Sequence, residues 1–207
     1  MKGPPPMSDP IDPTDHAFSA SVKAAQIRKG SRRLYAGMIL ADRVDARLAA
    51  FVAEARSFYL GTASADGQPY IQHRGGPKGF LRVLDDKRLA FADLRGNRQY
   101  ITTGNAAENR KAFLFLMDYA NRRRIKVWGE IDVIEGDAEL NAALAVPGYR
   151  GAPEQAIVFT ITAWDSNCPQ HIPQMLHADN VAEALASRDA RIAALEAQLA
   201  ALSENGT

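Results

Sequence analysis

Two strand-like runs around a turn stand in one stretch of the chain, FYLGTASADGQPYIQHRGG, which spans residues 58–76. Alternating residues flank Asp66-Gly67, a dipeptide typical of a two-residue hairpin turn. The second run ends in the basic, glycine-rich sequence His73-Arg74-Gly75-Gly76. Arginine offers a planar fork of donors, and glycine lets backbone N–H groups approach an anion. The stretch therefore predicts a β-hairpin whose tip suits a phosphate or another anion.

The period of two continues beyond this hairpin. It predicts seven strands, over residues 57–63, 68–74, 79–84, 88–93, 111–117, 123–134 and 155–164. Short helical patterns interrupt them at 97–109 and 136–145. In the longest strand, apolar side chains such as Ile125 and Ile131 share one face, and polar ones such as Lys126 and Glu130 share the other. We expect a mainly β fold with flanking helices, arranged as a closed or split antiparallel barrel.

The segments around this barrel differ in composition. Residues 1–15 hold five prolines and predict a disordered N-terminus. Residues 16–56 show helical spacing, with Asp42 or Asp45 as the cap of the second helix and a basic loop at Gly30-Ser31-Arg32-Arg33. The barrel domain is expected over 57–175 and an amphipathic helix over 178–203.

The predicted C-terminal helix carries a heptad seam. Its members follow one another in steps of four and three: Val181, Leu185, Arg188, Ile192, Leu195, Leu199 and Leu202. Arg188 is the one charged interruption of an otherwise apolar series. Two interpretations stay open, a helix packed on its own barrel and a helix paired with a second subunit.

Composition and charge set outer limits on function. Hydrophobic residues make up 46% and charged residues 24%, as in soluble globular proteins, and the net charge of +1 gives no global field for nucleic acid or membranes. The charge is uneven, because residues 74–126 hold 13 Lys/Arg and 5 Asp/Glu, an excess of 13 − 5 = +8. No signal peptide and no apolar run of ~20 residues is visible. We expect a cytoplasmic protein without a membrane segment.

Two further basic motifs follow the hairpin. Arg95-Gly96-Asn97-Arg98-Gln99-Tyr100 comes directly after a predicted strand and opens a helical pattern, where a helix N-terminus and Arg98 could bind a phosphate. Asn121-Arg122-Arg123-Arg124 enters the longest strand. Strand alternation would send Arg122 and Arg124 to one side and Arg123 to the other. At most two of these arginines could therefore serve one ligand.

The single cysteine, Cys168, excludes an intrachain disulfide and a metal-ligand pair of cysteines. His171 follows it by three residues, but no third residue that could orient a thiol–imidazole pair is evident. No metal-ligand cluster, Walker loop or Gly-x-Gly-x-x-Gly motif is present. Covalent thiol catalysis and metal catalysis are therefore not expected.

In this order, the motifs resemble those of the pyridoxamine 5′-phosphate oxidase-like family of flavin proteins. The similarity covers roughly residues 45–172 and includes His-Arg-Gly-Gly and Asn-Cys-Pro signatures at 73–76 and 167–169. It rests on the stretches Gln72-His73-Arg74-Gly75-Gly76, Gly96-Asn97-Arg98-Gln99-Tyr100, Arg123-Arg124-Ile125-Lys126-Val127-Trp128-Gly129 and Asn167-Cys168-Pro169. The resemblance implies an FMN-binding split β-barrel, a homodimer, and an oxidoreductase acting on a small molecule.

The resemblance also implies which residues hold FMN. Gln72, His73 and Arg74 stand where the family's arginine meets the phosphate and ribityl chain, and Asn97-Arg98-Gln99 stands at its phosphate-binding Ser-Arg-Lys. Arg124 corresponds to a glutamine beside the flavin ring, where a cation would favour the anionic reduced form. The full implied set is Gln72, His73, Arg74, Gly75, Asn97, Arg98, Gln99, Tyr100, Arg124 and Asn167.

Departures from the family's pattern argue against one activity of the family and leave non-enzymatic functions open. The C-terminal Trp and Arg that bind pyridoxal phosphate are not recognisable, so pyridoxine phosphate oxidation is not expected. The alternative is a non-enzymatic flavin, haem or deazaflavin carrier or sensor, in which His73, His171 or His177 would be the axial ligand of a haem. A nucleic-acid module is disfavoured because aromatic residues do not alternate with the basic ones.

Overall fold

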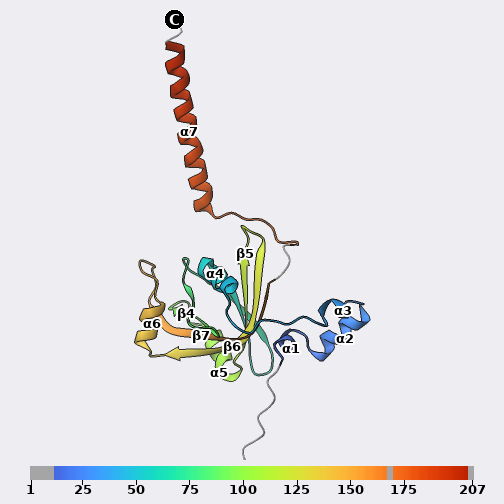
Figure 1. Ribbon diagram of the computed structural model, residues 1–207. Helices are drawn as coiled ribbons and strands as arrows, with labels where there is room; N and C mark the ends of the chain where they lie inside the picture. The colour runs from blue at the N-terminus through green and yellow to red at the C-terminus, as the bar shows by residue number, and fades with distance from the viewer. Residues whose placement is uncertain (1–11, 167–169, 205–207) are drawn as a thin grey trace, which may run out of the picture. The chain divides into compact units, whose positions relative to one another are not determined.

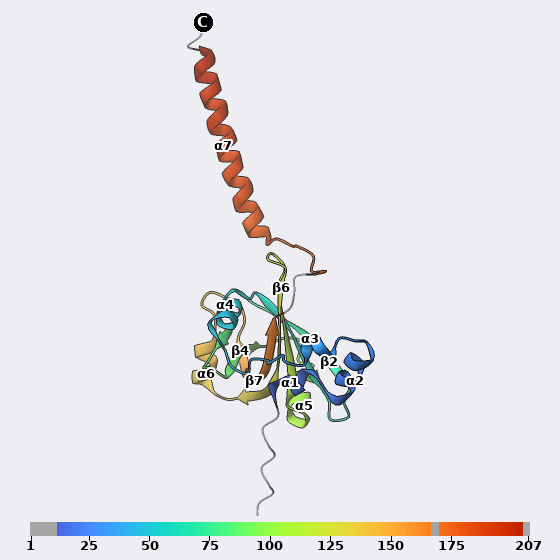
Figure 2. The same cartoon turned by 45° about the vertical axis from the view of Figure 1, so that its right-hand side comes forward.

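One antiparallel sheet dominates the computed structural model, which describes residues 12–166 and 170–204. Its strands are β1 (Ser57–Ala63), β2 (Pro69–Gly75), β3 (Leu81–Val83), β4 (Arg88–Leu94), β5 (Lys111–Asp118), β6 (Arg123–Glu135) and β7 (Pro153–Ser166). They are ordered β2-β1-β5-β6-β7-β4-β3. The sheet curls into a half-barrel around an apolar interior (Figures 1 and 2). Each predicted strand is present within two residues at either end, and the predicted split barrel is confirmed.

The inner face of the sheet holds the main core. Phe58, Leu60 and Leu114 are fully buried there, and α4 (Ala46–Glu54) contributes Leu48 and Phe51 to the same cluster. The carboxylate of Asp45, rather than that of Asp42, caps α4 by accepting the Leu48 N–H at 2.8 Å. Alternation along β1 and β5 therefore sorts apolar side chains inward, as the sequence predicts.

A bulge bends the two longest strands. The pairing of β6 with β7 shifts between Trp128 and Gly129, so that β7 carries one extra residue at this point. A Cβ at Gly129 would clash with the carbonyl oxygen of Thr160 and with the ring of Phe159. Only glycine lets the strands approach this closely, and the bulge increases the curl of the sheet.

The first helix begins earlier than the sequence predicts, whereas α5 and α6 begin a few residues later. They are α1 (Pro13–Ala17), α2 (Ala20–Arg28), α3 (Arg32–Tyr35), α5 (Ile101–Glu108) and α6 (Ala138–Leu144), besides α4 and the C-terminal α7 (Ala178–Glu204). Pro13 starts a helix within the segment predicted to be disordered, because proline suits the first helical turn and Asp12 caps it. Residues 1–11 lie outside the described residues. Arg32 and Arg33 form α3 rather than a loop, after Gly30 ends α2 at φ 77°.

The chain divides into two compact units. The first contains the barrel, and the second joins the β5–β6 hairpin tip, residues 118–123, to the C-terminal segment. Within the second unit, Gln174 Nε2 donates to the Ala120 carbonyl at 2.8 Å. Arg122 lies in the hairpin turn at φ 51°, so the predicted strand alternation does not extend to it.

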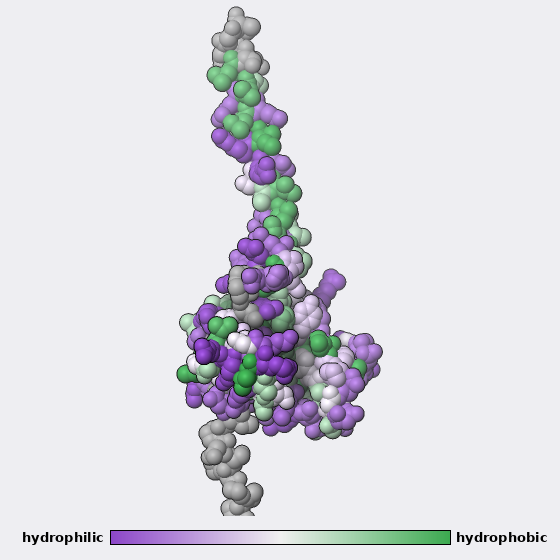
Figure 3. Space-filling model, turned by 90° about the vertical axis from the view of Figure 1, so that its right-hand side faces the viewer, coloured by the Kyte–Doolittle hydropathy of each residue, from purple (hydrophilic) through white to green (hydrophobic). Residues whose placement is uncertain are grey.

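Helix α7 covers the predicted amphipathic segment. All of its residues from Ala178 to Leu202 are exposed within the described structure, and apolar side chains run along its length (Figure 3). In the described part of the chain, none of the helices has the length and apolar character that a bilayer crossing requires. The same residues contain no group of three or more His, Cys, Asp or Glu side chains that could hold a metal ion.

Candidate functional site

A polar cavity of about 60 Å³ lies where β2, β4 and the start of α5 meet. It is lined by Tyr70, Gln72, Arg74, Asp93, Leu94, Gly96, Asn97, Arg98, Gln99, Tyr100, Ile101, Thr102, Thr103 and Glu154. Six of the ten residues predicted to hold FMN line this cavity: Gln72, Arg74, Asn97, Arg98, Gln99 and Tyr100. Motifs separated by about twenty residues are thus brought to one place.

The chain turns sharply into the N-terminus of α5 at this cavity. Arg98 and Tyr100 adopt left-handed backbone conformations, with φ 57° and 53°. Tyr100 occupies the cap position, and no side chain caps the helix. The first N–H groups of α5 are therefore available to a ligand, and Ile101, Thr102 and Thr103 of this first turn line the cavity. A helix N-terminus in this state favours an anion.

Arg74 reaches the cavity from β2 and is held in place by Asp93. One terminal nitrogen of its guanidinium donates to Asp93 Oδ1, and both side chains are 15% exposed. The guanidinium also lies 5.5 Å from the centre of the Phe91 ring. Its Nε is buried and has no hydrogen-bond partner among the described residues. Asp93 and the Phe91 ring therefore hold the Arg74 guanidinium at the wall of the cavity.

Buried polar contacts fix the first turn of α5 against the sheet. Gln155 Nε2 donates to Asp93 Oδ2 at 2.8 Å and to Thr103 Oγ1 at 3.0 Å. Thr102 Oγ1 donates to Gln72 Oε1 at 2.8 Å. Sequence reasoning did not select Asp93, Gln155 or the threonines. The one available signal was a polar residue beside an apolar strand run, which is too common to single them out.

The loop before α5 contributes charge at the cavity. The guanidinium of Arg98 makes no hydrogen bond or ion pair with the described residues. The Tyr100 hydroxyl donates to Glu154 Oε1 at 2.8 Å, and this hydrogen bond, followed by burial, raises the pKa of Tyr100 against the opposing charge of Arg98. Asn97 Oδ1 accepts the Gln99 N–H at 3.3 Å. Arg98 is thus a cation on the wall of the cavity that the protein itself leaves available.

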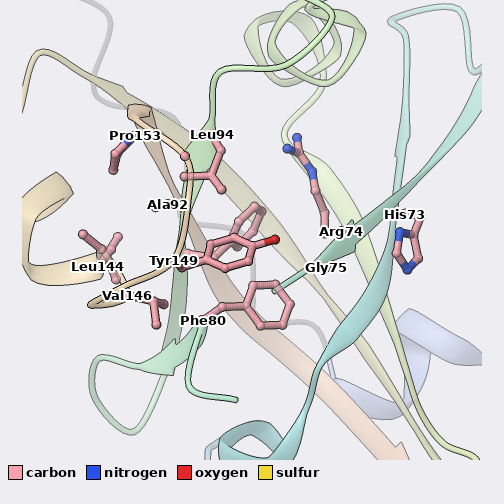
Figure 4. A pocket seen from close by; sticks show the side chains of 13 residues that line it. His73, Arg74, Gly75, Phe80, Ala92, Leu94, Leu144, Val146, Tyr149 and Pro153 are labelled. Atoms are coloured by element: carbon pink, nitrogen blue, oxygen red, sulfur yellow. The ribbon is translucent and has the colours of Figure 1, made fainter. Parts of the chain in front are cut away.

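A second, larger cavity of about 270 Å³ adjoins the first. Its walls are His73, Arg74, Gly75, Phe80, Phe91, Ala92, Leu94, Leu144, Ala145, Val146, Tyr149, Gly151 and Pro153. Figure 4 shows the rings of Tyr149 and Phe80 in the middle of this lining, with Arg74 extending from β2. Arg74 and Leu94 line both cavities. A polar compartment lined by two arginines and two carboxylates therefore stands beside a larger one whose lining residues are mostly apolar or aromatic, and Arg74 lines both.

The other four predicted residues are not among the described residues that line the polar cavity, and of these Gly75 lines the larger one. His73 faces the opposite side of β2 from Arg74, with its ring 5.6 Å from that of Tyr59, and lines only the larger cavity. Arg124 lines neither cavity; its guanidinium lies 5.8 Å from the centre of the Phe115 ring, and its buried Nε has no partner among the described residues. Asn167 lies outside the described residues, as does Cys168.

The family is shown by the sequence itself. The family model described as pyridoxamine 5′-phosphate oxidase matches residues 44–168, more than half of the chain. The chain belongs to this family. The resemblance inferred from the motifs is thereby confirmed, and the matched segment contains every strand of the half-barrel and both cavities. No curated protein matches the chain.

Solved structures resemble this chain at low sequence identity. HupZ of Group A Streptococcus is 16% identical with a TM-score of 0.50, over 64% of this chain and 99% of that one. An FMN-binding protein of Syntrophomonas wolfei is 16% identical with a TM-score of 0.47, over 76% and 97%. A Clostridium acetobutylicum protein related to general stress protein 26 is 16% identical with a TM-score of 0.44, over 67% and 99%. At 16% identity, the similarity to HupZ supports the fold alone.

Proposed function

We propose that this chain binds FMN, with the phosphate in the polar cavity, and catalyses a flavin-dependent redox reaction of a small molecule. One observation carries the proposal: the guanidinium of Arg74, the available cation Arg98 and the uncapped start of α5 meet at one cavity. Each of these groups favours an anion, and together they suit a phosphate dianion.

The rest of the network prepares the cavity for this ligand. Asp93 takes one terminal nitrogen of Arg74 and leaves the remaining donors of the fork for a ligand. Gln155 then fixes Asp93 and Thr103 together, so the first turn of α5 and the arginine keep a constant spacing. A preformed anion site of this kind loses less entropy when it binds its ligand.

The larger cavity suits a flat ring, such as that of a flavin, or a small substrate. Phe80, Tyr149 and Val146 supply an apolar wall for a flat ring or a small substrate, and Arg74 would touch the contents of both cavities. Bound FMN would supply the electron transfer, while these residues would orient the reactants and exclude water. We propose that the substrate is a small, partly apolar molecule.

Arg124 supports the proposal of a homodimer. Ile125, its neighbour, pairs with Ser166 at one end of β7, whereas Gln155 beside the polar cavity lies near the other end. The resemblance implies a cofactor at a subunit interface, and we propose that Arg124, which lines neither cavity, meets the flavin of a second copy.

The test is FMN binding by matched arginine variants. We expect the wild type to bind FMN and to show absorption near ~375 and ~450 nm, and Arg98→Ala to bind about 10- to 100-fold more weakly, because a charge-assisted hydrogen bond is lost. Arg95→Ala removes an arginine from the same loop that does not line the cavity, so its affinity should stay within about threefold. Equal losses in both variants, or no FMN uptake by the wild type, would reject the proposed site.

A non-enzymatic carrier of flavin, haem or deazaflavin is the second candidate. The position of His73 on the wall of the larger cavity is the observation that favours a haem. A Soret band that disappears in His73→Ala would support this alternative. Flavin absorption that NADH or NADPH bleaches, with recovery on adding an oxidant, would support an oxidoreductase. We keep the cytoplasm as the proposed location.

A further inference from the structure

Helix α7 carries an apolar seam that is exposed within its own unit. Its apolar members are Val181, Leu185, Ile192, Leu195, Leu199 and Leu202, and their exposed fractions run from 39% to 71%. The helix has 27 residues and is about 40 Å long. Most positions outside the seam are alanine or charged. An apolar stripe of this length, repeated in steps of four and three, is the pattern of a coiled-coil strand.

We propose that α7 pairs with α7 of a second copy of this chain as a parallel, in-register coiled coil. In heptad terms, Leu185, Ile192 and Leu199 take the a positions, and Val181, Arg188, Leu195 and Leu202 take the d positions. Ile192 followed by Leu195 is the a/d combination that favours two strands. This inference does not rest on FMN binding.

Charge complementarity selects the parallel direction. Arg191 takes a g position, and Glu196, five residues later, takes the following e position. In a parallel pair, each g residue faces the next e residue of the other helix. Arg191 of each copy then faces Glu196 of the other, which gives two ion pairs by symmetry. Within one helix, residues five apart do not face each other, so these charges have no such contact in the single chain.

The antiparallel direction opposes like charges. If the same apolar layers are stacked head to tail, with Ile192 against Leu195, the e positions face each other. Asp189 of each helix would then lie beside Glu196 of the other, which gives two acidic pairs instead of two ion pairs. The flanking charges therefore favour two parallel strands.

Arg188 accounts for the one polar layer of the seam. In the parallel arrangement, the two Arg188 side chains share a d layer, and Asp189, the next residue, flanks that layer on each helix. The guanidinium of each copy can reach Asp189 of the other while its stem covers apolar surface. A polar residue in a coiled-coil seam specifies register at a cost in stability. Arg188 therefore sets the register of the two helices, and the leucines contribute most of the affinity between them.

Cysteine cross-linking of the full chain tests the direction and register. In a Cys168→Ser background, Leu195→Cys places two thiols in one d layer, within the spacing that a disulfide requires. Ala197→Cys, the matched control, lies at an f position on the outer face. We expect the disulfide-linked dimer to form about tenfold faster with Leu195→Cys than with Ala197→Cys under mild oxidation. Equal rates would overturn the proposal, as expected if α7 packs on its own barrel.

Charge reversal tests the ion pairs independently. Arg191→Glu and Glu196→Arg each set like charges against each other, and each should slow the Leu195→Cys cross-link about fivefold. The double reversal restores the pair and should return the rate to within about twofold of the parent. Mixing the two single variants should also restore it, through mixed dimers. If neither the double reversal nor the mixture restores the rate, the proposed ion pair between Arg191 and Glu196 is wrong.

Discussion

Leucine side chains are buried in the barrel but exposed on helix α7. In the barrel, Leu114 on β5 and Leu60 on β1 are fully buried, and strand alternation directs them into a shared core. In α7, Leu185 and Leu195 are 52% and 40% exposed. Both regions have regular secondary structure and a clear apolar period. A regular apolar pattern thus indicates where burial is needed, but not whether the same chain provides it.

Polar groups show the same contrast. Around the polar cavity, Arg74, Asp93 and Gln155 are held by one another across three strands. On α7, Arg191 and Glu196 lie on an exposed helix with no facing partner at their spacing in the same chain. The polar groups around the cavity therefore find their partners within the barrel, whereas the charges of α7 are placed to contact a second helix.

The largest expected effect compares two identical substitutions. Leu114→Ala should lower the free energy of unfolding of the barrel by about 3 kcal/mol, because it opens a cavity in a closed core. Leu195→Ala should change it by less than about 0.5 kcal/mol and should weaken only the concentration-dependent association. Urea denaturation followed by tryptophan fluorescence measures the first effect, and sedimentation equilibrium the second. Equal losses of barrel stability in the two variants would contradict this difference between the barrel and α7.

A smaller effect separates buried and exposed ion pairs within the barrel. Arg74→Ala leaves the carboxylate of Asp93, 15% exposed, without its cation and should cost about 2 to 3 kcal/mol. Lys78→Ala removes the ion pair with Glu54, whose side chain is 67% exposed, and should cost less than about 0.5 kcal/mol. Both are measured by urea denaturation without added FMN. A tolerated Arg74→Ala would show that Asp93 is satisfied in another way.

The smallest effect concerns the hairpin tip in the second unit. Burial raises the pKa of Asp118, but hydrogen bonds from Arg123 and Asn121 outweigh it, so the net pKa is lowered. A lowered carboxyl pKa contributes stability above the unfolded value of 3.8, and this contribution is lost as the pH falls through the folded value. We expect the hydrogen-exchange protection of the Asn121 N–H, which donates to Asp118 at 3.1 Å, to decline with acid.

Asp118→Asn is the control for this titration. It removes the carboxylate at every pH and should lower the protection at pH 7 by about 1 kcal/mol, with little further decline in acid. A variant that keeps the acid-dependent decline of the wild type would assign the effect to another group.

Local pattern predicted the elements well because alternation and heptad spacing depend on near neighbours. The bounds of β1 and of α7, and Asp45 as a cap, follow from residues within a few positions of one another. The loop expected at Arg32-Arg33 was wrong because a four-residue helix has too little periodicity to be recognised. The anion motifs at Arg74 and Arg98 were selected by residue type, and the structure brings both to one cavity.

The strands, the heptad helix, the family and the two arginine motifs could be predicted from the sequence, since each of these is a property of a short run of residues. Which groups meet depends on how the strands are arranged in space. Asp93 and Gln155, 62 positions apart, join Arg74 because β4 pairs with β7 and curls toward β2. Strand order likewise keeps Arg124 from the cavity, because β1 and β5 lie between β2 and β6. Such contacts depend on strand order and curvature, which arise when the whole sheet closes around its core.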